Sequence, residues 1–165
     1  MTIYTNFVGI DIGKKEFVVN VLGQKSTKAY ENTAAGIALF IKAHTNILSS
    51  SLCVAEITGG YEMELILTLC EQRIAVHRAN GRYVKNFIRS LGGIAKTDAL
   101  DAKALALYAS ERHDKLALFE PASDRMLELR QLYQRRADLV KAMVAEKNRL
   151  KSPSNGFVKE SFEAM

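Results

Sequence analysis

Four carboxylates, Asp11, Glu56, Asp98 and Asp101, are the residues whose types and spacing could carry chemistry in this chain. Asp11 interrupts an apolar run, where a charge is costly unless it is paired or binds a metal. Glu56 ends a second apolar run, and Asp98 and Asp101 stand three residues apart, on one face of a helix. A cage of carboxylate oxygens suits Mg²⁺ or Mn²⁺. Two such ions can activate the attacking oxygen and stabilise the leaving oxygen when a phosphodiester is cleaved.

Each carboxylate also has a plainer interpretation. Asp11 could lie just past a strand end and be hydrogen-bonded in the turn, and Glu56 could be a solvated residue at a strand end. Asp98 and Asp101 could be acidic residues that the dipole favours at a helix N-terminus. Only convergence at one place in the fold would favour the metal site, so the discriminating observation is geometric.

The elements that must position these residues follow from the periodicity of the apolar residues. Runs rich in β-branched and aromatic residues predict five strands, and apolar residues at helical spacing predict helices between and after them. The expected strands are 7–13, 17–22, 26–31, 52–57 and 74–77, and the expected helices are 34–44, 61–71, 82–91 and 97 or 98 to about 111. This is the order of the ribonuclease-H-like fold, although other α/β folds could be read into it. In that fold the first strand, the fourth strand and a late helix converge on one edge.

Pro121 marks an expected boundary between a catalytic domain, residues 1–120, and a helical extension, residues 121–165. Apolar residues recur at roughly helical spacing from Met126 to Leu150, within a charged segment. This pattern predicts one long amphipathic helix from about Asp124 to Lys151, of helical-hairpin or coiled-coil type, which we expect to mediate self-association. Residues 157–165 resemble the start of another helix cut short, so we expect the chain to be a fragment of a longer protein.

Basic charge is concentrated in segments of this chain of 165 residues, whose formal net charge is +5. From Gln72 to Thr97 there are six basic residues and no acidic one, and from Pro121 to Lys151 there are eight basic and four acidic residues. Such clusters suit a phosphate-backbone partner, and the plainer interpretation is a set of solvated helix faces. The side chains expected to bind nucleic acid are Lys14, Arg78, Arg82, Lys85, Arg89 and Lys96.

The composition, 48% hydrophobic and 25% charged, is ordinary for a globular protein. No apolar run approaches the roughly 20 residues that span a membrane, and no signal peptide is visible. Cys53 and Cys70 lie in apolar patterns without CxxC spacing or nearby His partners, which predicts buried, reduced thiols. We therefore expect a cytoplasmic protein that has no membrane partner.

The chain carries three motifs, at residues 8–14 with Phe17, at residues 56–62, and at residues 95–102 with Leu105 and Ala106. They resemble the motifs of the DEDD-type bacterial insertion-sequence transposases, a family that includes pilin-gene-inverting recombinases. The motif around Asp11 is specific only in combination with the others, whereas the motif around Asp98 and Asp101 is quite specific. Residues 145–150 also resemble the family, in its helical region, so the resemblance covers nearly the whole chain in the right order.

The resemblance implies that Asp11, Glu56, Asp98 and Asp101 form the acidic tetrad of the family. It implies a RuvC-like α/β fold, with a five-stranded mixed sheet flanked by helices and a C-terminal long-helix extension. The implied activity is DNA strand cleavage and transfer at element ends, dependent on Mg²⁺ or Mn²⁺, by dimers or tetramers assembled on DNA. Family members are directed by a structured guide RNA and carry a catalytic serine in a C-terminal domain. This chain stops before that domain, so we do not expect full recombination from it alone.

Other interpretations remain beside this one. A non-catalytic nucleic-acid-binding and oligomerisation module would tolerate neutralisation of the four carboxylates. An actin-like or sugar-kinase ATPase would need a second phosphate-binding hairpin, which is not evident. Tyr61 lacks the Arg/His set of a tyrosine recombinase, so we expect it to pack or to contact DNA. One departure from the family is Asn80-Gly81, where Asn-Pro is frequent, and we expect a more flexible loop there.

Overall fold

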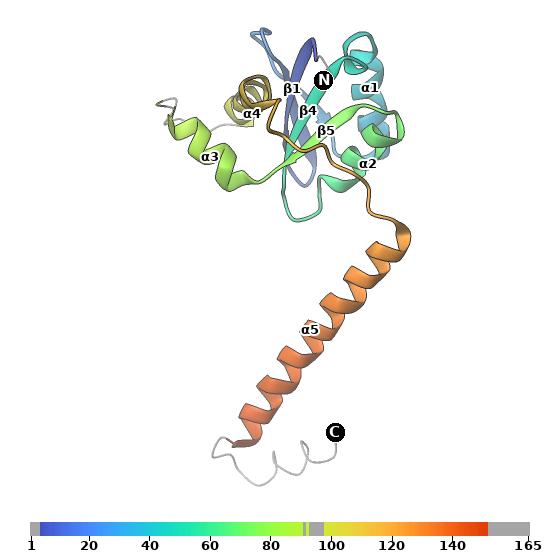
Figure 1. Ribbon diagram of the computed structural model, residues 1–165, viewed down its shortest axis with the longest axis vertical. Coiled ribbons are helices and arrows are strands. Elements are labelled where there is room, and N and C mark those ends of the chain that lie inside the picture. Colours follow the sequence, from blue (N-terminus) through green and yellow to red (C-terminus); the bar gives the residue numbers. More distant parts are fainter. Residues whose placement is uncertain (1–3, 91, 93–97, 152–165) are drawn as a thin grey trace. The chain divides into compact units, whose positions relative to one another are not determined.

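The computed structural model describes residues 4–90, 92 and 98–151, apart from the side chains of residues 98, 124, 127 and 130. The chain divides into two units, Met1–Pro121 and Ala122–Met165. The described part of the first unit is a sheet with helices on both faces (Figure 1). The strands are β1 (Asn6–Ile12), β2 (Glu16–Val21), β3 (Lys28–Glu31), β4 (Ser51–Glu56) and β5 (Ala75–Ala79). The helices are α1 (Ala34–Leu48), α2 (Met63–Glu71), α3 (Gly81–Ser90) and α4 (Asp98–Arg112), and the second unit contains α5 (Asp124–Lys151).

The five strands lie in the order β3-β2-β1-β4-β5. The first three form an antiparallel meander, because tight turns join them, whereas β4 and β5 run parallel to β1, because a helix precedes each of them. The ribonuclease-H-like, mixed five-stranded sheet expected from the sequence is confirmed. Its arrangement places the ends of β1 and β4 side by side in the centre of the sheet.

The strands divide their side chains between two cores, since successive residues of a strand face opposite sides. On one face, Val8, Ile10 and Ile12 of β1 join a cluster that also contains residues of α1 and α2. On the other face, Leu52 and Val54 of β4 pack with Leu105 of α4. By the same alternation, Asp11 and Glu56 belong to the face that α4 covers.

The element order is confirmed, but several boundaries differ from the expectation. Helix α1 runs to Leu48 rather than ending at His44, because Leu48 continues its buried face. Strand β5 ends at Ala79 rather than His77, since its parallel pairing with β4 continues to the pair Glu56 and Ala79. The helix expected at residues 157–165 lies outside the described residues.

A segment after α4, residues 113–120, crosses the outer edge of β5 and is called the strap below. The backbone N–H of Phe119 donates to the carbonyl oxygen of Val76 at 2.7 Å. Nδ1 of His77 lies 2.7 Å from the carbonyl oxygen of Ala117. The strap therefore supplies partners to an edge strand whose backbone groups would otherwise face outward.

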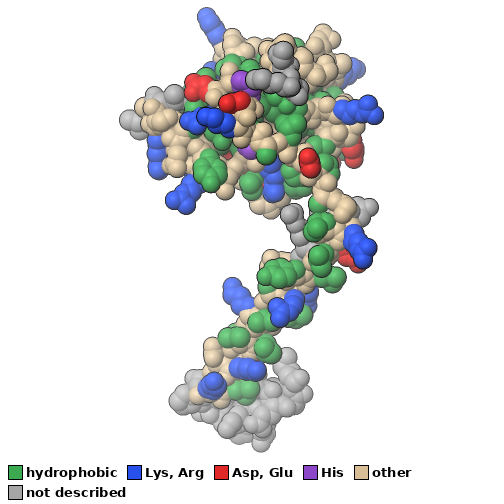
Figure 2. Space-filling view, in the orientation of Figure 1, with side chains coloured by type: hydrophobic (Ala, Val, Ile, Leu, Met, Phe, Trp, Pro, Cys, Tyr) green, Lys and Arg blue, Asp and Glu red, His purple; other side chains and the backbone are tan. Residues whose placement is uncertain are grey.

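In the second unit, the described residues form one helix, the 28-residue α5. Its large apolar side chains are exposed, and Figure 2 shows hydrophobic groups along it between basic ones. They are Met126, Leu129, Leu132, Tyr133, Leu139, Val140, Met143 and Val144. Among the described helices, α5 included, none is both long and apolar enough to cross a membrane.

Candidate functional site

Asp11 and Glu56 lie near the carboxyl ends of two adjacent parallel strands. The register pairs Gly9 with Val54 and Ile10 with Ala55, so its next step sets Asp11 beside Glu56. Adjacent strands are about 5 Å apart, and residues paired in this way have their side chains on the same face. Both residues are half-buried. The register therefore places the two residues side by side on one face of the sheet, and the joint action of their carboxylates stays a prediction.

Gly9 sets the approach of α4 to this edge. A β-carbon on Gly9 would stand 2.0 Å from the carbonyl oxygen of Ala102 and 2.3 Å from the backbone nitrogen of Ala106. Only a residue without a side chain permits a helix backbone to pack so closely on the strand. The ring of Phe7, near the start of β1, lies 5.5 Å from that of His113, just after α4. Helix α4 thus runs antiparallel to β1.

This direction brings the start of α4 to the carboxyl end of β1. Two strand residues span about 7 Å, and four to five helical residues span the same length. Gly9 lies level with the Ala102–Ala106 turn of α4. Asp11, two residues further along β1, therefore lies level with the first turn of this antiparallel helix. Asp101 lies in that turn and is half-buried, and Asp98 is the first residue of the helix. The side chain of Asp98 lies outside the described part of the structure.

The donor set fits a hard divalent cation, because all four candidates are carboxylates. Within the described residues, however, no group of three His, Cys, Asp or Glu side chains is placed to hold a metal ion. Cys53 is not a competing ligand, since it is fully buried and burial raises the pKa of its thiol to about 12. The elements thus converge at one edge, while the described side chains do not form a ready-made cage.

The carboxylate of Glu56 lies against the N-terminus of α3. A β-carbon on Gly81 would stand 2.1 Å from Oε1 of Glu56, so the glycine leaves room for this oxygen. The positive end of the helix dipole favours a negative charge at this place. Asn80 caps the helix, because its Oδ1 accepts from the backbone N–H of Arg82 at 2.9 Å. Asn80 alone separates β5 from α3, so the connection is a short capped turn rather than an open loop.

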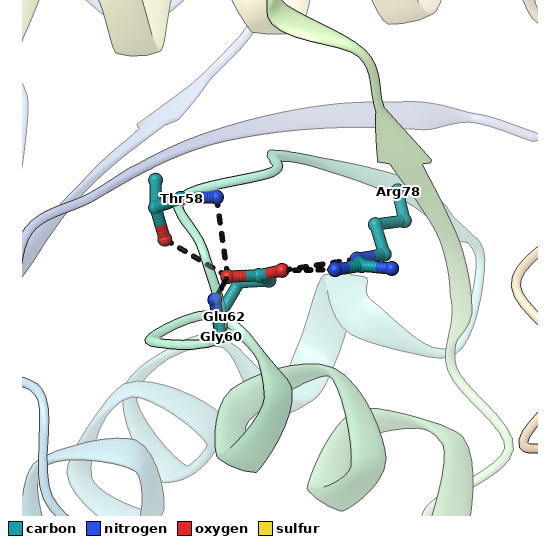
Figure 3. A network of polar contacts seen from close by, with 4 residues as sticks. All are labelled: Thr58, Gly60, Glu62 and Arg78. Atoms are coloured by element: carbon teal, nitrogen blue, oxygen red, sulfur yellow. Dashed lines mark hydrogen bonds and ion pairs between the residues drawn. The ribbon is translucent and has the colours of Figure 1, made fainter. Parts of the chain in front are cut away.

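A buried ion pair holds the loop that follows Glu56 (Figure 3). Oε1 of Glu62 accepts from Nη2 of Arg78 at 2.5 Å and from Nε at 3.0 Å. Oε2 accepts from the backbone N–H of Thr58 at 3.2 Å, from its hydroxyl at 2.9 Å and from the backbone N–H of Gly60 at 2.9 Å. Burial opposes the charge, but the hydrogen bonds from Arg78 and the loop outweigh it and hold the pKa of Glu62 at about 2.

Sequence reasoning missed Glu62, because an acidic residue before an apolar helix is ordinarily read as a helix-terminus charge. The signal that could have found it is Arg78, but the expected strand ended at His77, so nothing marked Arg78 as an enclosed cation that must find a partner. Arg78 lies on the face opposite Glu56, since it pairs in register with Ala55. The structure therefore places this predicted nucleic-acid contact, with its side chain 31% exposed, against Glu62.

Asn32 joins the two loops that follow Asp11 and Glu56. Its Nδ2 donates to the carbonyl oxygen of Gly13 and to that of Tyr61, both at 3.0 Å. Its backbone N–H donates to the carbonyl oxygen of Lys15 at 2.9 Å. Sequence analysis gave Asn32 no bridging role, because the bridge depends on residues that are distant in the chain. The side-chain amide of Asn32 therefore bridges the backbone of Tyr61 and the turn after Asp11.

The other predicted nucleic-acid contacts lie in two places. Lys14 is exposed in the turn after β1. Helix α3 buries Val84 and Phe87 and exposes its basic side chains, and Figure 2 shows Lys and Arg groups over this helix. The exposed basic residues of α3 are Arg82, Lys85 and Arg89. Lys96 lies outside the described residues.

Comparison with known proteins places this arrangement in a family. The model of a transposase family, of the DEDD type and named for IS110, matches residues 8–153. The pilin gene-inverting protein of Moraxella lacunata is 28% identical over 148 residues, which are 87% of this chain and 45% of that protein. The pilin gene-inverting protein of Moraxella bovis matches to the same extent. The chain therefore spans less than half the length of these relatives. Because the family model covers most of the chain, the chain belongs to the DEDD transposase family of the IS110 type.

Proposed function

We propose that this chain is the N-terminal catalytic domain of a DNA transposase or site-specific recombinase. It cleaves and transfers DNA strands at element ends, in the bacterial cytoplasm, with Mg²⁺ or Mn²⁺ as cofactor. The observation that carries the proposal is the convergence of Asp11, Glu56 and the first turn of α4 at one edge of the sheet. Membership of the transposase family supports the same function.

The residues have distinct roles in this proposal. Asp11, Glu56, Asp98 and Asp101 would hold the divalent ions, which when bound would activate the attacking oxygen and stabilise the leaving one. Lys14 and the basic face of α3 bind phosphates beside this edge and orient the strand to be cut. The carboxylate of Glu56 lies beside Gly81, at the N-terminus of α3 that Asn80 caps.

The partners follow from the surfaces of the two units. DNA is the substrate, and a structured guide RNA binds the same basic segments to select the site. The exposed apolar side chains of α5 mediate dimer or tetramer formation, because a helix in water gains stability when it buries such a stripe against a second copy.

One observation favours a second function, a non-catalytic nucleic-acid-binding and oligomerisation module. The described carboxylates do not form a group of three that is ready to hold a metal. Under this alternative, Asp11 and Glu56 stabilise the sheet edge, and neutralising them leaves nucleic-acid binding unchanged. The alternative predicts no specific metal affinity with or without DNA.

Calorimetry of Mn²⁺ and Mg²⁺ binding separates the two functions. We compare the wild-type chain with Asp11→Asn and Asp101→Asn, each alone and with branched DNA. Asp114→Asn is the matched control, because Asp114 is an exposed carboxylate just beyond the opposite end of α4. Binding that both site variants lose and the control retains supports the metal site. Binding that neither site variant changes, or no binding even with DNA, supports the non-catalytic module.

A further inference from the structure

The loop between β4 and α2, residues 57–62, has an ordered conformation although it lacks regular structure. The backbone N–H of Ile57 donates to the carbonyl oxygen of Ala79 at 3.0 Å, which continues the β4–β5 ladder by one residue. Gly59 and Gly60 adopt positive φ angles of 82° and 120°, which glycine accepts without strain. Glu62 then collects the donors of Thr58 and Gly60 on one carboxylate oxygen (Figure 3). The loop is thus fixed from within.

Tyr61 is the aromatic residue of this loop. Its carbonyl oxygen accepts a hydrogen bond from Asn32, which also donates to Gly13, two residues after Asp11. Two side chains of the loop are large, apolar and exposed, Ile57 at 39% and Tyr61 at 47%, and only Tyr61 has a ring. A held backbone fixes where this ring emerges at the surface, and an exposed aromatic ring offers a face on which a base can stack.

A gain in stability alone is a weak explanation for the ion pair of Glu62 with Arg78 that holds this loop. The side chain of Glu62 is 0% exposed, and a buried ion pair contributes little more to stability than apolar residues of similar volume. What the pair adds is a single geometry, because one carboxylate fixes Thr58, Gly60 and Arg78 at the same time. The geometry is imposed on the segment between Glu56 and α2, beside the candidate site.

We propose that Glu62 is a positioning residue, which with Arg78 locks residues 57–61 so that Tyr61 stacks on an unpaired base next to the scissile phosphate. This inference rests on the proposed function, since it names how the same site holds its nucleic acid. Glu62 acts through the loop and does not touch the substrate. Tyr61 contacts the substrate through its ring, and its hydroxyl is not required.

The test is a double-mutant cycle on affinity for a labelled synthetic four-way DNA junction that carries one unpaired nucleotide at its branch point, measured by fluorescence anisotropy without divalent ions. The variants of the full chain are Tyr61→Ala, Glu62→Gln and both together, with Tyr61→Phe to keep the ring. Base stacking on an aromatic residue supports an expected loss of about tenfold in affinity for Tyr61→Ala. We expect a similar loss for Glu62→Gln and no further loss in the double variant, because both remove the same contact. Tyr61→Phe should bind as the wild type does.

The matched control is Glu64→Gln, the same chemical change at an exposed position two residues further on. Hydrogen exchange of the Thr58 and Gly60 amides should accelerate by about tenfold or more in Glu62→Gln and stay unchanged in the control. Effects of Tyr61→Ala and Glu62→Gln that add in the double variant, or a loss in Tyr61→Phe, would overturn the inference. If the wild type binds and Tyr61→Ala binds equally well, the inference fails alone. If the wild type does not bind the junction, the proposed function fails with it.

Discussion

Two ion pairs, one in each unit of the chain, join the same kinds of side chain in different surroundings. Glu62 and Arg78 come from the start of α2 and from β5, sixteen residues apart, and the glutamate side chain is fully buried. Glu146 and Arg149 lie three residues apart on α5, with exposed side-chain fractions of 37% and 65%. The first pair forms only when sheet, loop and helix are all in place, whereas the second needs only a turn of helix.

The difference shows which unit depends on long-range contacts. Removing one partner of a buried pair leaves an uncompensated charge or an unsatisfied donor and typically costs about 3–5 kcal/mol. An exposed pair within a helix contributes about 0.3–0.5 kcal/mol and is screened by salt. We therefore expect single changes to have large effects on folding in the first unit. In the second, we expect them to act through association rather than folding.

The largest effect should come from Gly9→Ala, which tests the packing of the first unit. The new methyl group would collide with the backbone of α4 at Ala102 and Ala106, which cannot move as freely as a side chain. We expect a loss of about 3 kcal/mol or more in the free energy of unfolding, measured by urea denaturation. Gly81→Ala is the matched control, because its methyl group would meet only the flexible end of Glu56. Equal losses in both variants would contradict this account of α4.

The next largest effect should be a pH dependence that belongs to Glu62. Its pKa in the folded chain is about 2, below the ordinary value of 4.5, so the folded state favours the charged form. This contribution is fully present above about pH 5 and is lost as the pH falls toward 2. The shift corresponds to roughly 3 kcal/mol. Urea denaturation between pH 7 and pH 3 should show the stability gap between wild type and Glu62→Gln narrowing as the pH falls. A difference in stability that stays constant over this pH range would contradict the low pKa of Glu62.

The smallest effect should come from Glu146→Gln on α5, the counterpart of Glu62→Gln in the exposed pair. We expect a change of at most about 0.5 kcal/mol in unfolding free energy, because both side chains are at least one third exposed and the pair spans a single turn of helix. Raising the salt concentration should abolish even this difference. A loss as large as that of Glu62→Gln would mean that this pair is buried in an assembly, which sedimentation at several protein concentrations would reveal.

Much of the scaffold could be predicted, because local periodicity determines it. The apolar run around Asp11 identified β1, and the long apolar repeat identified α5 with the bounds observed. The positions of Asp11 and Glu56 at adjacent strand ends followed from the fold and the motifs. The ion pair of Glu62 with Arg78 and the bridge of Asn32 could not be predicted. Each depends on how a loop without periodicity folds back on a distant element.

Arg78 illustrates the limit most directly. In sequence it belongs to a basic segment without acidic residues, which favoured a role in phosphate binding. The strand extends past the expected end, however, and register places Arg78 on the face toward α2. Charge counting gives the sign of a surface, but it does not say which cations reach that surface. Among the described members of the segment, Arg82, Lys85 and Arg89 are exposed on α3.

The strap has a consequence for aggregation. A β-strand at the edge of a sheet is a template for pairing with other chains and for domain swapping. At one edge, β3 is only four residues long, with Lys28 and Glu31 exposed. At the other edge, the amide of Phe119 occupies the carbonyl of Val76. A version of this domain shortened before Phe119 would uncover β5 and invite intermolecular strand addition, so the smallest well-behaved fragment must extend beyond that residue.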